Sequence, residues 1–225
     1  MSLRYPLLIP VTLLVVLATA LAAELVVVED WSTHAVGVKG LPAQWQRQNW
    51  GSPAYDFTIA EDGGRKVVHL RSANDSSNIS KEIKGEVNLK ETPILEWSWR
   101  VVVLPKGADS RKKATDDQAA QLYVTWPRFP QAVRSQIIGY VWDTTAPATS
   151  FVKSQKTGMV TYVIVRSGTA DLGKWITERR NVAEDYKKIF GEAPDSPGAI
   201  SLAIDSDDTA SSAESFFGPI RFRKP

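Results

Sequence analysis

The sequence contains no cysteine and only two histidines. Without cysteine, the chain has no disulfide, no thiolate nucleophile and no cysteine-based metal site. The histidines, His34 and His69, stand alone, and the sequence has neither an H-E-x-x-H zinc motif nor a glycine-rich phosphate-binding loop. Neither sign of charge dominates, because 27 basic residues face 25 acidic ones, so nucleic acid is not expected as a partner.

Long hydrophobic runs are also scarce, and the one that occurs covers residues 7–21. It follows the basic residue Arg4 and ends in small residues at Ala20 and Ala22, which is the pattern of an export signal. Pro10 breaks the run, which is short for a membrane span, and an uncleaved membrane anchor is the alternative. The pattern predicts a signal peptide at 1–23, a single domain at 24–225, and a periplasmic or secreted protein that meets a membrane only through this signal.

Residues 94–101, Ile-Leu-Glu-Trp-Ser-Trp-Arg-Val, have the alternation of a half-buried strand. Side chains along a strand point to opposite faces in turn, so this octet has one apolar and one polar face. The apolar face holds Leu95, Trp97, Trp99 and Val101, and the polar face holds Glu96, Ser98 and Arg100.

Short β-rich runs recur along the chain, separated by turn residues. The predicted strands cover residues 25–28, 35–39, 66–71, 78–83, 94–103, 120–126, 136–142, 150–153, 160–166, 199–205 and 215–223. These runs exceed what a seven-stranded immunoglobulin domain needs. They predict an all-β fold, a two-sheet antiparallel β-sandwich of the jelly-roll type.

Residues 181–190 break this β pattern. Val182, Tyr186, Ile189 and Phe190 fall at helical spacing, and Asn181 precedes them as a helix N-cap. We therefore expect one amphipathic helix packed on the sandwich, with its aromatic stripe serving as core.

The polar faces of several strands would form one surface if those strands shared a sheet. The residues predicted to bind a ligand there are Glu96, Arg100, Tyr123, Tyr140, Trp142, Tyr162, Arg166 and Asp205. Aromatic rings can cover the apolar face of a sugar while polar groups bond its hydroxyls, and arginine pairs with carboxylates, so an acidic sugar or small anion also fits. The alternative is a polar sheet face that only meets water, or aromatic residues covered by the helix or a loop.

Two further segments of the chain have the composition of functional loops. The stretch 105–117, rich in charged residues, is either functional or mobile. The segment Asp205-Ser206-Asp207-Asp208-Thr209 is similar to the start of a calcium loop, but Ala210 and Phe216 stand where that loop needs glycine and glutamate. We therefore predict no metal and no other cofactor, with a looser calcium site on the sandwich rim as the alternative.

Several stretches together resemble a known bacterial family. They are Leu95-Glu96-Trp97-Ser98-Trp99-Arg100-Val101, Asp116-Asp117-Gln118-Ala119-Ala120, Tyr140-Val141-Trp142, Leu172-Gly173-Lys174-Trp175, Arg180-Asn181-Val182, Asp185-Tyr186, Phe190-Gly191 and Asp205-Ser206-Asp207. In this order they are similar to domain of unknown function 3047, over about residues 31–222. The resemblance implies no established activity and no catalytic residues. At the level of fold it implies likeness to jelly-roll modules that bind carbohydrates, which alone does not imply function.

The sequence thus favours an exported, non-catalytic module that binds a saccharide or another polar ligand on a concave sheet. One alternative is a polysaccharide or cell-wall hydrolase that uses Glu96, Asp205 or Asp117 as acid or base. The other is an envelope module whose sheet face docks a partner protein. Nothing in the sequence indicates an oligomeric state.

Overall fold

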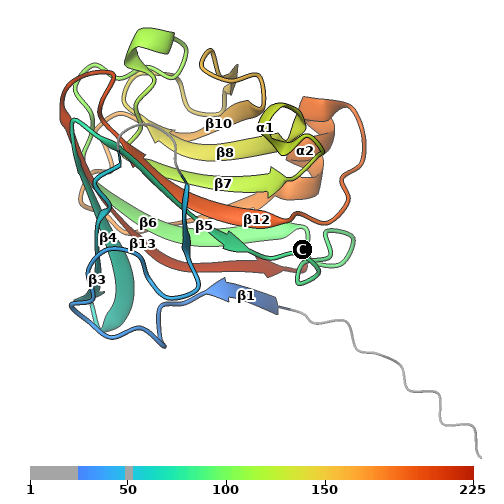
Figure 1. Ribbon diagram of the computed structural model, residues 1–225, viewed down its shortest axis with the longest axis horizontal. Helices are drawn as coiled ribbons and strands as arrows, with labels where there is room; N and C mark the ends of the chain where they lie inside the picture. The colour runs from blue at the N-terminus through green and yellow to red at the C-terminus, as the bar shows by residue number, and fades with distance from the viewer. Residues whose placement is uncertain (1–24, 49–52) are drawn as a thin grey trace, which may run out of the picture.

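Two packed β-sheets make up the protein in this computed structural model, which describes residues 25–48 and 53–225 (Figure 1). The predicted signal peptide at 1–23 lies outside the described residues. The six-stranded sheet follows the order β11 (Ile176–Asn181), β6 (Ile94–Val103), β13 (Ser212–Arg223), β4 (Arg65–Ala73) and β3 (Asp56–Asp62), with β1 (Leu25–Glu29) also paired to β13. The seven-stranded sheet follows the order β2 (Gln46–Gln48), β5 (Ser76–Glu82), β12 (Ala199–Asp205), β7 (Ala120–Trp126), β8 (Gln136–Asp143), β10 (Val160–Ser167) and β9 (Phe151–Lys153).

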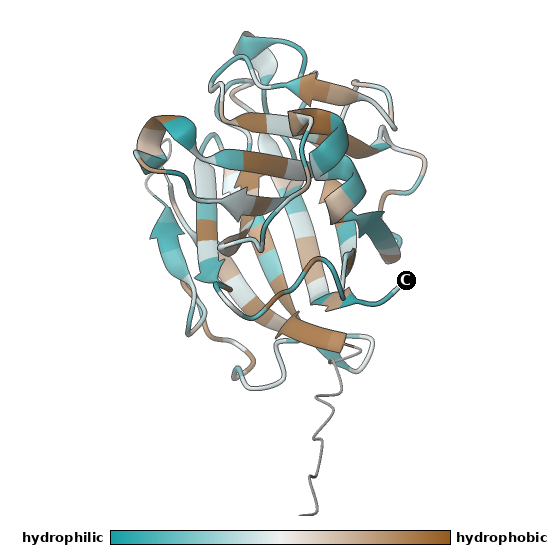
Figure 2. Cartoon of the chain, turned by 90° about the vertical axis from the view of Figure 1, so that its right-hand side faces the viewer, coloured by the Kyte–Doolittle hydropathy of each residue, from teal (hydrophilic) through white to brown (hydrophobic). Residues whose placement is uncertain are grey.

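This architecture confirms the predicted all-β sandwich of jelly-roll type. Hydrophobic and hydrophilic segments succeed one another along the strands, because successive side chains face the core and the outside in turn (Figure 2). One pairing departs from the antiparallel expectation: β8 and β10 run parallel. In the described part of the chain, no helix is long and apolar enough to cross a membrane.

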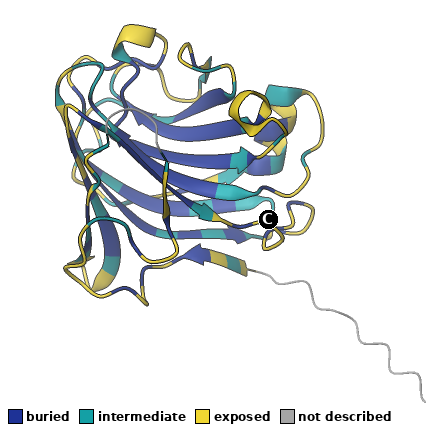
Figure 3. Ribbon diagram, viewed as in Figure 1, coloured by how far each residue is buried: buried dark blue, intermediate teal, exposed yellow. Residues whose placement is uncertain are grey.

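An aromatic layer joins the two sheets at the centre of the sandwich. Trp97 and Trp99, on the predicted inner face of β6, are fully buried, with ring centroids 5.3 Å apart. Trp97 lies 5.3 Å from the ring of Tyr140, and Trp99 lies 6.0 Å from the ring of Trp142, both on β8 of the opposite sheet. The strands are mostly buried, and exposed residues concentrate in the loops and helices (Figure 3).

Most predicted strands occur near their expected positions, but the run at 35–39 is wrong. Gly37 and Gly40 both have positive φ there, so the chain turns, and only an isolated bridge joins Lys39 to Thr58. Two strands, β2 and β11, were not predicted from the sequence. The segment of β11, Ile-Thr-Glu-Arg-Arg-Asn, carries polar groups on both faces and therefore has no apolar alternation to detect.

The predicted helix is α2 (Val182–Phe190), and a single turn, α1 (Gln131–Arg134), precedes β8. The Asn181 side chain caps α2 by accepting a 3.2 Å hydrogen bond from the N–H of Glu184, and Gly191 ends the helix in the left-handed conformation. Tyr186 is fully buried with its ring 4.6 Å from that of Trp126, so the aromatic stripe is core, as expected.

Hydrogen bonds and ion pairs to buried carboxylates fix the conformation of the stretch 105–117. Asp109 accepts hydrogen bonds from Arg111 Nε and Nη2 at 2.7 and 2.9 Å, and Lys112 Nζ lies 3.1 Å from it. Asp143 at the end of β8 accepts a 2.9 Å hydrogen bond from the N–H of Ser110. These contacts give the segment one defined path toward Asp116 and Asp117.

Replacing Trp97 with alanine tests the aromatic layer. We expect Trp97→Ala to lower the free energy of unfolding by about 4 kcal/mol, because the change opens a cavity between the sheets. Val133→Ala is the control, since Val133 is 71% exposed and its loss should change stability by less than ~0.5 kcal/mol. Urea unfolding, followed by tryptophan fluorescence, measures the free energy of unfolding of both variants. Equal losses of stability in the two variants would contradict a central role of Trp97 in the core.

Asp109 gives a prediction with a defined pH dependence. Hydrogen bonds from Arg111 hold the pKa of the buried Asp109 carboxyl well below its ordinary 3.8. A lowered folded-state pKa stabilises the protein fully above about pH 4 and loses that contribution as the pH falls. Asp109→Asn should therefore cost about 2 kcal/mol at pH 7, and the difference from the wild type should shrink from about pH 4 downward.

The matched control for this substitution is Asp56→Asn. Asp56 pairs with Arg71 in an exposed ion pair, so its loss should change the free energy of unfolding little at any pH. Urea unfolding measures the free energy of unfolding of each variant. If the loss of stability in Asp109→Asn stays constant from pH 7 to pH 2, the negative charge of Asp109 does not stabilise the fold.

Candidate functional site

The outer face of the seven-stranded sheet carries an open hollow of about 360 Å³, here called the neutral hollow. Strand alternation places its lining. Leu202 of β12 and Leu122 and Val124 of β7 face the core, so Ser201, Tyr123 and Thr125 face outward into the hollow. The volume lies within the usual range for small-molecule sites.

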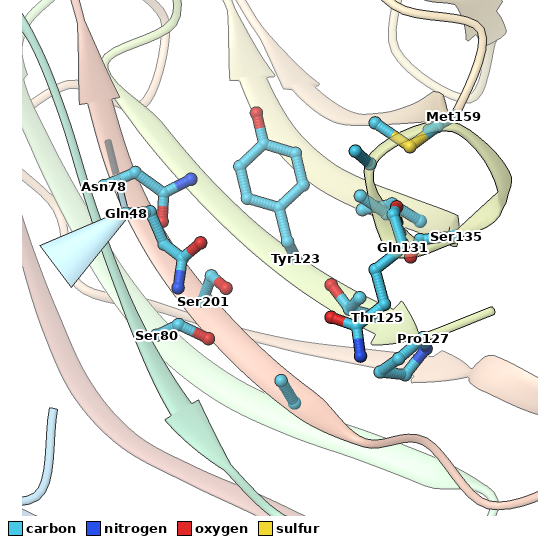
Figure 4. Close-up of a pocket in the computed structure, with 13 residues that line it drawn as sticks. Gln48, Asn78, Ser80, Tyr123, Thr125, Pro127, Gln131, Ser135, Met159 and Ser201 are labelled. Atoms are coloured by element: carbon cyan, nitrogen blue, oxygen red, sulfur yellow. Dashed lines mark hydrogen bonds between the residues drawn. The ribbon is translucent and has the colours of Figure 1, made fainter. Parts of the chain in front are cut away.

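The lining of the neutral hollow mixes polar and apolar side chains and carries no charge. None of the described residues that line it is an Asp, Glu, Lys, Arg or His. Figure 4 shows Tyr123 at the centre of the hollow, between two groups of polar side chains. One group holds Gln48, Asn78, Ser80 and Ser201, and the other holds Thr125, Gln131 and Ser135. Amides and hydroxyls both donate and accept hydrogen bonds, so this lining suits a ligand with many hydroxyls.

Gly139 on β8 allows two tyrosine rings to converge at the floor of the site. It lies between Tyr123 of β7 and Tyr162 of β10 in the strand register. A Cβ atom at this position would lie 2.7 Å from Tyr123 Cε1 and 3.0 Å from Tyr162 Cδ1. Glycine is therefore the residue that lets both rings lie over the sheet, and any side chain would displace them.

Asn78 of β5 contributes a buried hydrogen-bond acceptor to the lining of the site. It is only 4% exposed, and its Oδ1 has no hydrogen-bond partner among the described residues. Buried polar atoms are nearly always satisfied, so a free acceptor that lines a hollow is what a bound hydroxyl or amine would complete.

A second hollow of about 290 Å³, here called the acidic hollow, adjoins the first and shares Asn78, Tyr123 and Met159 with it. Asp116, Asp205 and Asp207 line it together with Lys156. Burial raises the pKa of the Asp116 carboxyl to about 6. Burial, together with the neighbouring Asp207 and Asp117 carboxylates, raises the pKa of Asp205 to about 10.

Carboxylates at this end of the site are spaced for a cation. Ligand oxygens of Asp117, Asp205 and Asp207 lie within 4.8 Å of one another, a spread that calcium–oxygen bonds of about 2.4 Å can bridge. Asp117 is oriented by the N–H and Oγ1 of Thr209, at 2.7 and 2.6 Å. These residues include Asp205 and Asp207 of the segment similar to a calcium loop, and they are the described residues that could hold a metal.

The single surface expected from the sequence does not form, because β6 belongs to the other sheet. Glu96 and Arg100 therefore lie on the outer face of the six-stranded sheet. Glu96 pairs there with Arg179, 2.7 Å away, and the Arg100 guanidinium lies 4.3 Å from the centre of the Phe216 ring. Neither residue reaches the neutral hollow.

Three further expected site residues are engaged elsewhere. Tyr140 and Trp142 point into the core, where Tyr140 donates a 2.9 Å hydrogen bond to Asp185 and Trp142 Nε1 donates to the Gly168 carbonyl at 3.0 Å. A bulge in β10 precedes Arg166, which is tied to Glu178 at 2.6 Å. The prediction that Tyr140 and Trp142 of β8 face outward was wrong. The residues that do face outward, Ile137 and Val141, are apolar as well, so hydrophobicity does not distinguish the two faces of this strand.

Tyr123, Tyr162 and Asp205 are the predicted residues that the structure brings together, and all three line the acidic hollow. Asn78, Ser80 and Gln48 were missed. They come from β5 and β2, whose pairing beside β12 depends on contacts between distant parts of the chain. The only signal in the sequence is the polar alternation at Ser76, Asn78 and Ser80, which has no aromatic residue to mark it.

Two of the carboxylates expected to serve a hydrolase, Glu96 and Asp205, lie far apart. Glu96 and Asp205 lie on the outer faces of different sheets, and packed sheets alone are about 10 Å apart. Paired glycosidase carboxylates are separated by at most about 9.5 Å. These two residues therefore cannot flank one glycosidic bond.

Comparison with known proteins gives one family match. A family model described as protein of unknown function DUF3047 matches residues 43–221. No significant match was found among curated proteins.

Several solved structures are similar in fold. The family 11 carbohydrate-binding module of Clostridium thermocellum is 7% identical, with a TM-score of 0.46 over 90% of this chain and 97% of that one. The family 30 module of a cellulosomal cellulase from the same organism is 10% identical, with a TM-score of 0.45 over 89% and 97%. The K2 cleaved adhesin domain of Lys-gingipain is 9% identical, with a TM-score of 0.43 over 88% and 98%.

Proposed function

The chain belongs to the DUF3047 family, and we propose that it binds an uncharged saccharide on the outer face of its seven-stranded sheet without cleaving it. One observation carries the proposal: the neutral hollow combines amides, hydroxyls and a central tyrosine with no charged residue among its described lining. A sugar needs this combination, because it presents hydroxyls at its edge and C–H groups on its faces.

The absence of charge in this lining supports an uncharged ligand. An anionic sugar would have to leave water without a cationic partner in the neutral hollow, which costs free energy. Arg100 and Arg166, expected from the sequence to hold a carboxylate, make their contacts elsewhere. We therefore do not include acidic sugars and small anions among the proposed ligands, although the sequence allowed them.

The proposal includes an exported location. It rests on the signal-peptide pattern of residues 1–23, and an exported module would meet polysaccharides outside the cytoplasm.

Two substitutions test saccharide binding. Asn78→Ala removes the free acceptor, and Thr125→Val removes a hydroxyl from the hollow while keeping the β-branched shape. Each should weaken binding about tenfold, because each removes one hydrogen bond to the ligand. Thr177→Val is the matched control, since Thr177 is exposed on β11 of the other sheet. Affinity gel electrophoresis with mixed-linked β-glucan, xylan and glucomannan measures retention, with polygalacturonate as the anionic comparison.

We expect at least one neutral polysaccharide to retain the wild type. The two site variants should lose this retention, and Thr177→Val should keep it. The proposal is overturned if the wild type ignores all three neutral polymers, binds only polygalacturonate, or loses binding equally in Thr177→Val.

Hydrolysis is the second candidate function, and one observation favours it. Asp116 lines the acidic hollow beside the saccharide site, and its raised pKa suits a general acid. A hydrolase would release reducing ends from the polysaccharide that it binds, and Asp116→Asn would abolish that release while binding persists. We expect no reducing ends from the wild type, and a measurable, Asp116-dependent release would establish the second function instead.

A further inference from the structure

We infer that the ligand is a linear chain of uncharged sugars lying along strands β5, β12 and β7, and that Phe129 is a second stacking platform at one end of its groove. The inference rests on the proposed function and specifies its ligand class.

The groove is longer than the neutral hollow. A third hollow of about 620 Å³ adjoins it and shares Ser80, Pro127, Gln131 and Ala199 with it. With the acidic hollow at the opposite end, the three depressions succeed one another along the same face of the sheet.

The outward residues of β5 show the direction of the groove. Ser76 lines the acidic hollow, Asn78 the acidic and neutral hollows, Ser80 the neutral and third hollows, and Glu82 the third. From Ser76 to Glu82 the strand advances by six residues, which is about 20 Å at ~3.3 Å per residue. One pyranose ring does not fill that length, so the groove fits a chain whose units follow the strand direction.

Phe129 lies at the third hollow with its ring in solvent. It is 88% exposed, in the short connection between β7 and β8. An exposed aromatic ring bordering a polar groove offers an apolar face on which a sugar ring can stack. Tyr123 and Phe129 would then contact different units of one chain.

Charge in the third hollow does not select an ionic ligand. Arg128 and Asp195 satisfy each other through two hydrogen bonds of 3.0 and 2.7 Å. Glu82 and Lys84, which also line it, have opposite signs. The described lining of the third hollow therefore has no net formal charge. A saccharide that extends from the neutral hollow into the third hollow can accordingly be uncharged along its whole length.

The test is a length series of oligosaccharides, from disaccharide to hexasaccharide, made from the neutral polysaccharide that the wild type retains. Isothermal titration calorimetry should show affinity rising with chain length for the wild type. Phe129→Ala should weaken hexasaccharide binding about tenfold and leave disaccharide binding unchanged, because only the longer chain reaches the platform. Val133→Ala is the matched control, an exposed apolar residue of α1 that lines none of the three hollows.

The outcomes separate this inference from the proposed function. Affinity that is independent of chain length, or a Phe129→Ala variant that weakens all lengths equally, overturns the inference and leaves saccharide binding intact. Failure of every neutral polysaccharide to bind overturns both. A dimer of the wild type that Phe129→Ala converts to monomer in analytical ultracentrifugation assigns the ring to a contact between copies and overturns the inference too.

Discussion

The aromatic layer between the sheets is the interaction on which the rest of the structure depends. Trp97 and Trp99 from one sheet meet Tyr140 and Trp142 from the other, and all four side chains are buried. When these rings lie in the interior, the residues that alternate with them along each strand must face outward, because successive side chains point to opposite faces. The outer face of the seven-stranded sheet is thus a consequence of the packing on its inner face, and the orientation of Tyr123 toward the hollow follows from that of Leu122 and Val124 toward the core.

The site depends on register as much as on orientation. Tyr123 and Tyr162 converge because β7, β8 and β10 place Gly139 between them, and a shift of β8 by two residues would put Ile137 or Val141 there instead. The binding surface is therefore a property of three aligned strands, and no single segment of the chain contains it.

This dependence explains how far the sequence could predict the structure. Alternation located β6 and β7 to the residue, and helical spacing with the Asn181 cap located α2, because those signals are local. Alternation sorts residues into two faces but does not say which sheet a strand joins. Glu96 and Arg100 were consequently assigned to the wrong sheet.

The second failure of prediction arises where both faces of a strand are apolar. In β8, Ile137 and Val141 pack in a small outer cluster with Tyr162, while Tyr140 and Trp142 enter the core, so hydrophobicity alone does not orient the strand. Asn78 was missed for a related reason, since its importance comes from neighbours on β12 and β7 that are distant in sequence.

The two outer faces of the sandwich differ in the charge of their polar groups. On the six-stranded sheet, charged residues pair with one another, as Glu96 does with Arg179 and Arg223. On the seven-stranded sheet, the neutral hollow holds uncharged groups, and Asn78 Oδ1 has no partner within the described chain. An ionic face favours charged partners, whereas a hollow lined by amides and hydroxyls favours a ligand without charge. The proposed site therefore lies on the seven-stranded sheet.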